Sequence, residues 1–165
     1  MYERILVPLD GSELAEQILR HVEALAGRFG SSVTLLRAIP PLDAFIMSTS
    51  AAPIMGQPIA PYPVTDPAEL ADAERAEATA YLQKVAQRLG KGGFEVKHAE
   101  PDGAAADVII RWAQAPGADL IAMTTHGRSG LGRLVMGSVA DEVLHKTPCP
   151  VLLVRTSEES APKET

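Results

Sequence analysis

The chain has 165 residues, 46% of them hydrophobic and 22% charged, and its formal net charge is −6. This composition predicts one globular domain with a sizeable core, and no apolar run is long enough to span a membrane. The acidic balance argues against a surface for nucleic acid, which needs a basic face.

The N-terminus and the cysteine content both predict a cytoplasmic protein. Residues 1–4 lead straight into a strand-like stretch, without the basic region and apolar run of a secretory signal. Cys149 is the one cysteine, so no internal disulfide can form, as expected in a reducing compartment.

The first forty residues predict a strand, a helix and a second strand. Residues 5–9 are apolar and precede Asp10 in a turn signal. Apolar residues then recur at helical spacing up to Gly27 or Gly30, where we expect the helix to end. The second strand is predicted over residues 32–39.

Residues 40–65 are rich in proline and have no clear period, which predicts a long irregular connection. Order returns with Asp66 as an N-cap, Pro67 at the first helical position and Glu69 placed to close a capping box. We expect this helix to run to about Leu89.

The second half of the chain again alternates strands with helices. The predicted elements are a strand at 94–99 with edge-like alternation, a helix at 104–115, a strand at 120–123, a helix ending near Lys146 and a strand at 151–154. One domain over residues 1–155 is therefore expected, followed by a flexible acidic tail over residues 156–165. Its class is α/β: an open parallel sheet with helices on both faces and right-handed crossovers.

The glycine-rich segment 125–138 joins a predicted strand to a predicted helix. Glycines let the backbone approach a ligand, and the helix N-terminus adds converging N–H groups and a partial positive charge. These features indicate a phosphate site. The segment lacks the Gly-Lys-Ser/Thr ending of a P-loop, and Val135 replaces the third glycine of a dinucleotide fingerprint, so neither chemistry is expected.

The chain resembles the universal stress protein family over residues 1–155. The motifs that carry the resemblance are Val-Pro-Leu-Asp-Gly-Ser at 7–12, Thr-His-Gly-Arg-Ser-Gly-Leu at 125–131, Gly-Ser-Val-Ala at 137–140 and Pro-Cys-Pro-Val-Leu-Leu-Val-Arg at 148–155. Members of its ATP-binding branch carry Gly, two residues, Gly, nine residues, then Gly with Ser or Thr. Gly127 and Gly137-Ser138 match this motif, whereas Thr124 occupies the first glycine position.

The resemblance implies a Rossmann-like, adenine-nucleotide α-hydrolase-like sheet of five parallel strands in the order 3-2-1-4-5. It also implies a homodimer through the last strand, residues 151–154, and ATP with Mg²⁺ as the ligand. The site residues that it implies are Pro8, Asp10, Ala38, Met123, Thr124, Gly127, Arg128, Gly130, Gly137, Ser138 and Val139.

Four of these residues have specific expected roles. Asp10 would hold the adenosine part, and Ala38 would offer its backbone N–H and C=O groups to the adenine edge. Ser138 would bind a phosphate oxygen, and Arg128 would offset phosphate charge. Simpler roles stay open, because Asp10 and Ser138 could each be an ordinary helix N-cap and the glycines could be turn residues.

No catalytic or metal-ligating residue is predicted. The four histidines lack metal-ligand spacing, and His126 has no serine, cysteine or carboxylate at a spacing that implies a dyad. No general base is evident near the proposed phosphates, so any ATP hydrolysis should be slow. We therefore expect a nucleotide-responsive regulatory or protective factor.

Two alternatives stay open. An adenylyl-transferring enzyme of a related fold would usually carry Ser-Gly-Gly or His-x-Gly-His after the first strand, and residues 9–12 show neither. A stress-type domain without bound nucleotide would act through its dimer or partner surface. Thr124 is the feature that keeps this second alternative open.

Overall fold

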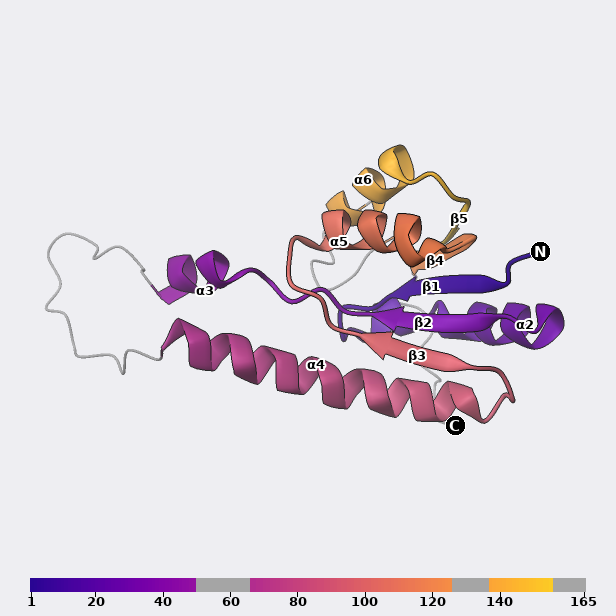
Figure 1. Ribbon diagram of the computed structural model, residues 1–165, viewed down its shortest axis with the longest axis horizontal. Helices are drawn as coiled ribbons and strands as arrows, with labels where there is room; N and C mark the ends of the chain where they lie inside the picture. The colour runs from indigo at the N-terminus through magenta and orange to yellow at the C-terminus, as the bar shows by residue number, and fades with distance from the viewer. Residues whose placement is uncertain (50–65, 126–136, 156–165) are drawn as a thin grey trace, which may run out of the picture.

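Five parallel strands form one sheet in the computed structural model, which describes residues 1–49, 66–125 and 137–155 (Figure 1). The strands are β1 (Arg4–Pro8), β2 (Ser32–Leu36), β3 (Val96–Ala99), β4 (Leu120–Thr124) and β5 (Val151–Val154). Their order is β3-β2-β1-β4-β5, and every neighbouring pair is parallel. The predicted sheet, its strand order and its central first strand are confirmed.

Helices cover both faces of the sheet. The helices α1 (Glu13–Glu16), α2 (Leu19–Phe29) and α4 (Pro67–Gly90) pack on one face, and α5 (Ala105–Trp112) and α6 (Ser138–Lys146) pack on the other. Figure 1 shows α4 along one side of the sheet and α5 with α6 along the opposite side. None of the helices in the described part of the chain combines the length and apolar character needed to cross a membrane.

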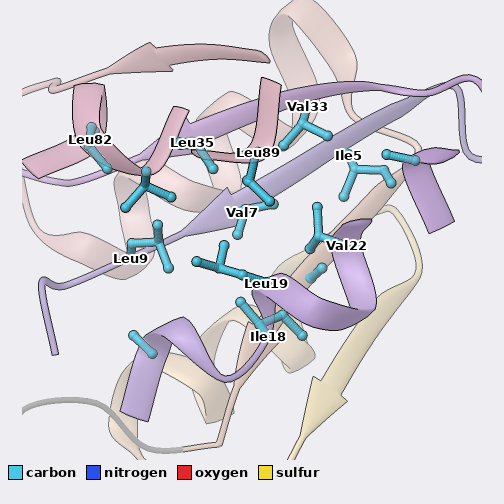
Figure 2. Packing of buried hydrophobic residues seen from close by; sticks show 14 of the residues in the cluster. Ile5, Val7, Leu9, Ile18, Leu19, Val22, Val33, Leu35, Leu82 and Leu89 are labelled. Atoms are coloured by element: carbon cyan, nitrogen blue, oxygen red, sulfur yellow. The ribbon is translucent and has the colours of Figure 1, made fainter. Parts of the chain in front are cut away.

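Large aliphatic side chains fill the layer between the sheet and α1, α2 and α4. Figure 2 shows sheet-side residues facing helix residues, namely Ile5, Val7, Leu9, Val33 and Leu35 opposite Ile18, Leu19, Val22, Leu82 and Leu89. A smaller core on the other face joins Leu6, Ile121 and Met123 to α5 and α6. Burying one large aliphatic side chain contributes about 1.5–3 kcal/mol, so these layers supply much of the folding free energy.

The first predicted helix is divided in two. Gln17 and Ile18 donate backbone hydrogen bonds only three residues back, which ends α1 before α2 begins. The break lets the consecutive residues Ile18 and Leu19 both be buried, whereas a regular helix turns successive side chains by about 100°. The helix α2 is closed by Gly30, whose φ of 68° is left-handed. Gly30 is one of the two end points that the sequence predicted.

The predicted irregular connection at residues 40–65 is helical in its first part. Residues Leu42–Thr49 form α3, which packs against α4 beyond the carboxyl ends of the strands (Figure 1). Proline is absent from this stretch, so its backbone N–H groups are free to form helical bonds. Residues 50–65 lie outside the described residues, as does the predicted tail at 156–165.

The later helices begin as predicted, but one of them changes form. Asp66 caps α4, its carboxylate accepting from the Ala68 N–H at 2.9 Å, and Pro67 occupies the first turn. The helix predicted over 104–115 ends as α5 at Trp112 and continues as the π-helical turn η1 (Ala113–Gly117). Gly117 at φ 84° then turns the chain into β4.

The strands β3 and β5 form the two edges of the sheet. The edge position of β3 confirms the expectation from its alternating polarity. In β5, Leu152 and Val154 pack toward one core and Val151 and Leu153 toward the other, yet all four residues are only half-buried. An apolar edge strand is therefore left open to pairing.

Candidate functional site

A cavity of about 310 Å³ opens where β2, β1 and β4 end side by side. The chain leaves β1 toward β2 on one side and later returns to β4 on the other, so this is the switch point of the strand order. The cavity is lined by Pro8, Leu9, Asp10, Ala15, Leu36, Arg37, Ala38, Pro40, Glu74, Ala105, Ile109, Met123, Thr124, Thr125, Gly137, Ser138, Val139 and Ala140. The turn after β1 contributes to it, and so do the described ends of the glycine-rich segment, Thr125 and Gly137-Ser138.

The first turn of α6 presents backbone donors to the cavity. Gly137 is the N-cap of this helix, and its N–H donates to the Thr125 carbonyl at 2.8 Å. Ser138, Val139 and Ala140 follow as the first helical residues, whose N–H groups have no acceptor within the helix. These donors and the helix dipole suit an anion, so this end of the cavity can hold phosphate.

Gly137, and not Ser138, is thus the N-cap of α6. The simpler role considered for Ser138, an ordinary helix N-cap, is therefore wrong. The physical reason is local geometry: Gly137 has the extended backbone of a cap (φ −61°, ψ 145°), and Ser138 already belongs to the helix.

Ala38 turns its backbone groups toward the open side of β2. Arg37 and Ile39 donate their N–H groups to Ala99 and Pro101, at 3.1 and 2.9 Å, on the β3 side. Backbone groups alternate in direction along an extended chain, so those of Ala38 face the β1 side, where β1 has already ended. A donor and an acceptor three bonds apart are thereby offered at the cavity, as an adenine edge would require.

Asp10 organises the turn that follows β1. Its carboxylate Oδ1 accepts from the Ser12 N–H at 3.0 Å and from the Ser12 hydroxyl at 2.6 Å. Ser12 in turn caps α1 by accepting from the Ala15 N–H, and Gly11 at φ 84° makes the turn possible. Asp10 is therefore not the N-cap considered for it. That position belongs to Ser12, which lies directly before α1 with an extended backbone (φ −87°, ψ 151°).

The buried residue Arg37, which no sequence motif predicted, forms part of the cavity wall. The Arg37 side chain is only 3% exposed, and its Nη2 donates to Glu74 Oε1 at 2.6 Å and to Glu77 Oε1 at 3.4 Å. The guanidinium also lies over the ring of Tyr81, 5.8 Å from the centroid. A buried guanidinium needs such partners, so the first half of α4 is tied to the end of β2.

The phenol of Tyr81 lies beneath this arginine. Burial raises the pKa of the Tyr81 hydroxyl well above its usual range, and the carboxylates of Glu16 and Asp10 add to the effect. The hydroxyl oxygen is buried and has no hydrogen-bond partner among the described residues. The phenol therefore stays neutral and contributes an uncharged ring to the support of Arg37.

Eight of the eleven predicted site residues line this cavity. They are Pro8, Asp10, Ala38, Met123, Thr124, Gly137, Ser138 and Val139. Gly127, Arg128 and Gly130, and also His126, lie outside the described residues. Thr124 is 7% exposed, so it stands in the wall at the first glycine position of the motif.

The residues that sequence reasoning missed come mainly from β2 and the helices. Arg37 carried a usable signal, because it is a charge at the end of an apolar strand at the ligand-binding edge. Glu74, Ala105 and Ile109 carried none, since only the packing of α4 and α5 brings them there. Within residues 1–49, 66–125 and 137–155, no group of three histidine, cysteine or acidic side chains is arranged to hold a metal ion.

Comparison with known proteins identifies a family to which this chain is similar. The model of the universal stress protein family matches residues 1–155. Universal stress protein MJ0577 of Methanocaldococcus jannaschii is 31% identical over 160 residues, covering 94% of this chain and 96% of that protein. The solved structure of MJ0577 covers 96% of this chain and 99% of its own, with a TM-score of 0.79 at 29% identity.

Two more distant structures share the fold. A universal stress protein solved in complex with cAMP has a TM-score of 0.64 at 20% identity, covering 94% of this chain and 98% of that one. A universal stress protein family member from Arabidopsis thaliana, solved with AMP bound, has a TM-score of 0.64 at 14% identity, covering 98% and 96%.

Proposed function

Since the chain belongs to the universal stress protein family, we propose that it is a cytoplasmic, homodimeric member that binds ATP. In this role it acts as a regulatory or protective factor and hydrolyses ATP slowly at most. Binding would favour whichever arrangement of the surrounding loops contacts the nucleotide better. The single cysteine, Cys149, is consistent with a reducing compartment.

The observation that carries the proposal is the meeting of two chemically different ends in one cavity. The start of α6 offers several N–H groups to phosphate, and Ala38 offers a donor and an acceptor next to an apolar wall. Adenine nucleotides occupy this fold in two distant proteins, so the fold accommodates the class. Mg²⁺ would arrive bound to the phosphates of ATP.

The test is the thermal stability of nucleotide-stripped protein with millimolar ATP and Mg²⁺, and with GTP as the comparison ligand. A ligand at a hundred times its Kd adds about 2.7 kcal/mol, which corresponds to a rise in Tm of roughly 2–6 °C at this size. We expect this rise with ATP and none with GTP.

The variant Gly137→Asp tests the site itself. Aspartate is a favourable N-cap and Gly137 has a negative φ, so the helix should form, but a carboxylate would face the phosphates. The matched control Gly137→Asn has the same shape without the charge. Loss of the ATP response in Gly137→Asp, with most of it kept in Gly137→Asn, is expected. An unchanged response in Gly137→Asp would overturn the assignment of this site.

The proposed dimer pairs through β5. The carbonyl of Pro150 accepts from Ile121 in β4, and that of Val154 accepts from Thr125 just after β4. By alternation, Val151 and Leu153 direct their N–H and C=O groups away from the sheet. Leu153→Pro removes one outward donor and should convert a dimer into a monomer in analytical ultracentrifugation. Leu153→Ala, which loses packing but keeps the donor, should stay dimeric. A dimer that survives Leu153→Pro would place the interface elsewhere.

A further inference from the structure

The cavity has three chemically distinct walls. Backbone donors at the start of α6 form the first wall, and apolar groups from Ala38, Ala105 and Ile109 form the second. The third wall carries the charged side chains among the described lining residues: Asp10, Arg37 and Glu74. A nucleotide likewise has three distinct parts, which are its phosphates, its base and a sugar that bears hydroxyl groups.

The third wall cannot take phosphate, because its one guanidinium is already neutralised. Arg37 is bound by both Glu74 and Glu77, and Asp10 adds a further carboxylate. The wall is therefore net negative. Carboxylates repel phosphate and accept hydrogen bonds from hydroxyls, which matches the sugar. The other donor of the ligand, the adenine amino group, is the one proposed to meet the Ala38 carbonyl.

Glu74 is the better placed of the two carboxylates to act on the ligand. Asp10 Oδ1 already accepts two bonds from Ser12. In Glu74, Oε1 is the atom that Arg37 engages, and the side chain keeps 24% of its surface exposed. Arg37 itself is buried and braced by Tyr81, so it holds the Glu74 carboxylate in one orientation at the wall.

We infer that Glu74, oriented by Arg37, accepts a hydrogen bond from a ribose hydroxyl and makes the site selective for ribonucleotides. This inference rests on the proposed function, because it assumes an adenine nucleotide in the cavity. Glu74 is then a specificity-determining residue, and Arg37 is a positioning residue. The same acidic wall excludes nucleotides that carry a phosphate monoester, with its two negative charges, on the 2′ or 3′ oxygen.

Calorimetric titration with ATP and with 2′-deoxy-ATP and 3′-deoxy-ATP tests the inference. Losing a hydroxyl that donates to a carboxylate should weaken binding by about tenfold, so one deoxy analogue should bind that much more weakly than ATP. Glu74→Met has a side chain of similar length and no acceptor. It should bring the ratio of the deoxy analogue's Kd to the Kd of ATP close to one. Glu77→Met is the matched control: it removes the other Arg37 partner from outside the cavity and should keep the ratio.

The wild-type protein supplies a second measurement that needs no variant to fold. Adenosine 3′,5′-bisphosphate and adenosine 2′,5′-bisphosphate should both bind at least about tenfold more weakly than AMP, because a phosphate would meet the acidic wall.

The outcomes separate this inference from the proposed function. If ATP and both deoxy analogues bind equally, or if Glu74→Met keeps the tenfold ratio, the role of Glu74 is wrong while the nucleotide site stands. Equal loss of selectivity in Glu74→Met and Glu77→Met would also overturn it, since the effect would then come from Arg37 alone. If no adenine nucleotide binds at all, the proposed function fails together with the inference.

Discussion

The two halves of α4 differ in how they contact the rest of the domain. In the second half (residues 78–90), Ala78, Leu82, Val85 and Leu89 are buried. In the first half no residue is buried, and charged side chains reach the end of the sheet instead: Glu74 and Glu77 bind Arg37, while Arg75 binds Asp102 and the Glu100 carbonyl. One half stabilises the domain by excluding water, and the other shapes the cavity through ion pairs.

The difference follows from where the strands end. Beside the second half, α4 meets continuous apolar sheet, and burial of aliphatic groups is favourable. Beside the first half, the strands have ended, as Figure 1 shows, so the helix meets loops and a cavity. Stability and ligand selectivity should therefore respond to separate sets of residues.

The largest effect is expected from Leu82→Ala in the apolar half. Leu82 is fully buried, so the truncation should lower the free energy of unfolding by about 2–5 kcal/mol in urea denaturation. Its exposed neighbour is the control, and Gln83→Ala should change the same quantity by less than about 0.5 kcal/mol. If Leu82→Ala lowers the free energy of unfolding by no more than Gln83→Ala does, the apolar half is not what stabilises the domain.

A smaller loss is expected from Arg37→Met in the polar half. Removing the guanidinium leaves Glu74 and Glu77 facing each other, but both are partly exposed, so the cost should be about 1–3 kcal/mol. A double-mutant cycle with Glu74→Gln should give a favourable coupling energy. A more stable Arg37→Met protein would show that the pair serves the cavity at the expense of stability.

Tyr81→Phe connects the two halves and should be neutral or stabilising by up to about 1 kcal/mol near neutral pH. The substitution removes a buried hydroxyl that has no partner among the described residues, and it keeps the ring under Arg37.

The same variant has a signature at alkaline pH. The folded-state pKa of Tyr81 is raised above the ordinary value of 10.0, so the unfolded chain loses its proton first. The contribution of the neutral phenol is therefore complete below about pH 10 and is lost as the pH rises above it. Urea denaturation from about pH 7 to about pH 11 should show an advantage of Tyr81→Phe that grows above pH 10. A constant advantage across this range would contradict the cause assigned to the shift.

The smallest effect is expected from Arg88→Ala at the end of α4. Arg88 Nη2 lies 2.5 Å from Glu16 Oε2, but the arginine side chain is 59% exposed. Such pairs contribute about 0–1 kcal/mol and weaken with salt, so the loss should shrink further in about 1 M salt. A loss as large as that of Arg37→Met would show that surface pairs stabilise this domain as much as buried ones.

The site residues at strand ends and helix starts could be predicted from the sequence, whereas Glu74 in the helix α4 could not. Asp10, Ala38, Gly137 and Ser138 lie on segments where a strand ends or a helix begins, and short motifs mark such points. Their meeting in one cavity agrees with the expectation from the parallel topology. Glu74 lies within a long helix whose charged residues look alike in sequence, so nothing local distinguished it from Glu77.

Local chemistry determined the strands, the capped start of α4, the glycine ends and the parallel class, because alternation, caps and positive φ angles depend on residues a few positions apart. Tertiary packing alone decided the break between α1 and α2 and the charged wall of the cavity. Arg37 and Glu74 are 37 positions apart, and their contact depends on how a whole helix crosses the end of a strand. Such a crossing is set by the summed packing of many side chains, which no short stretch of sequence contains.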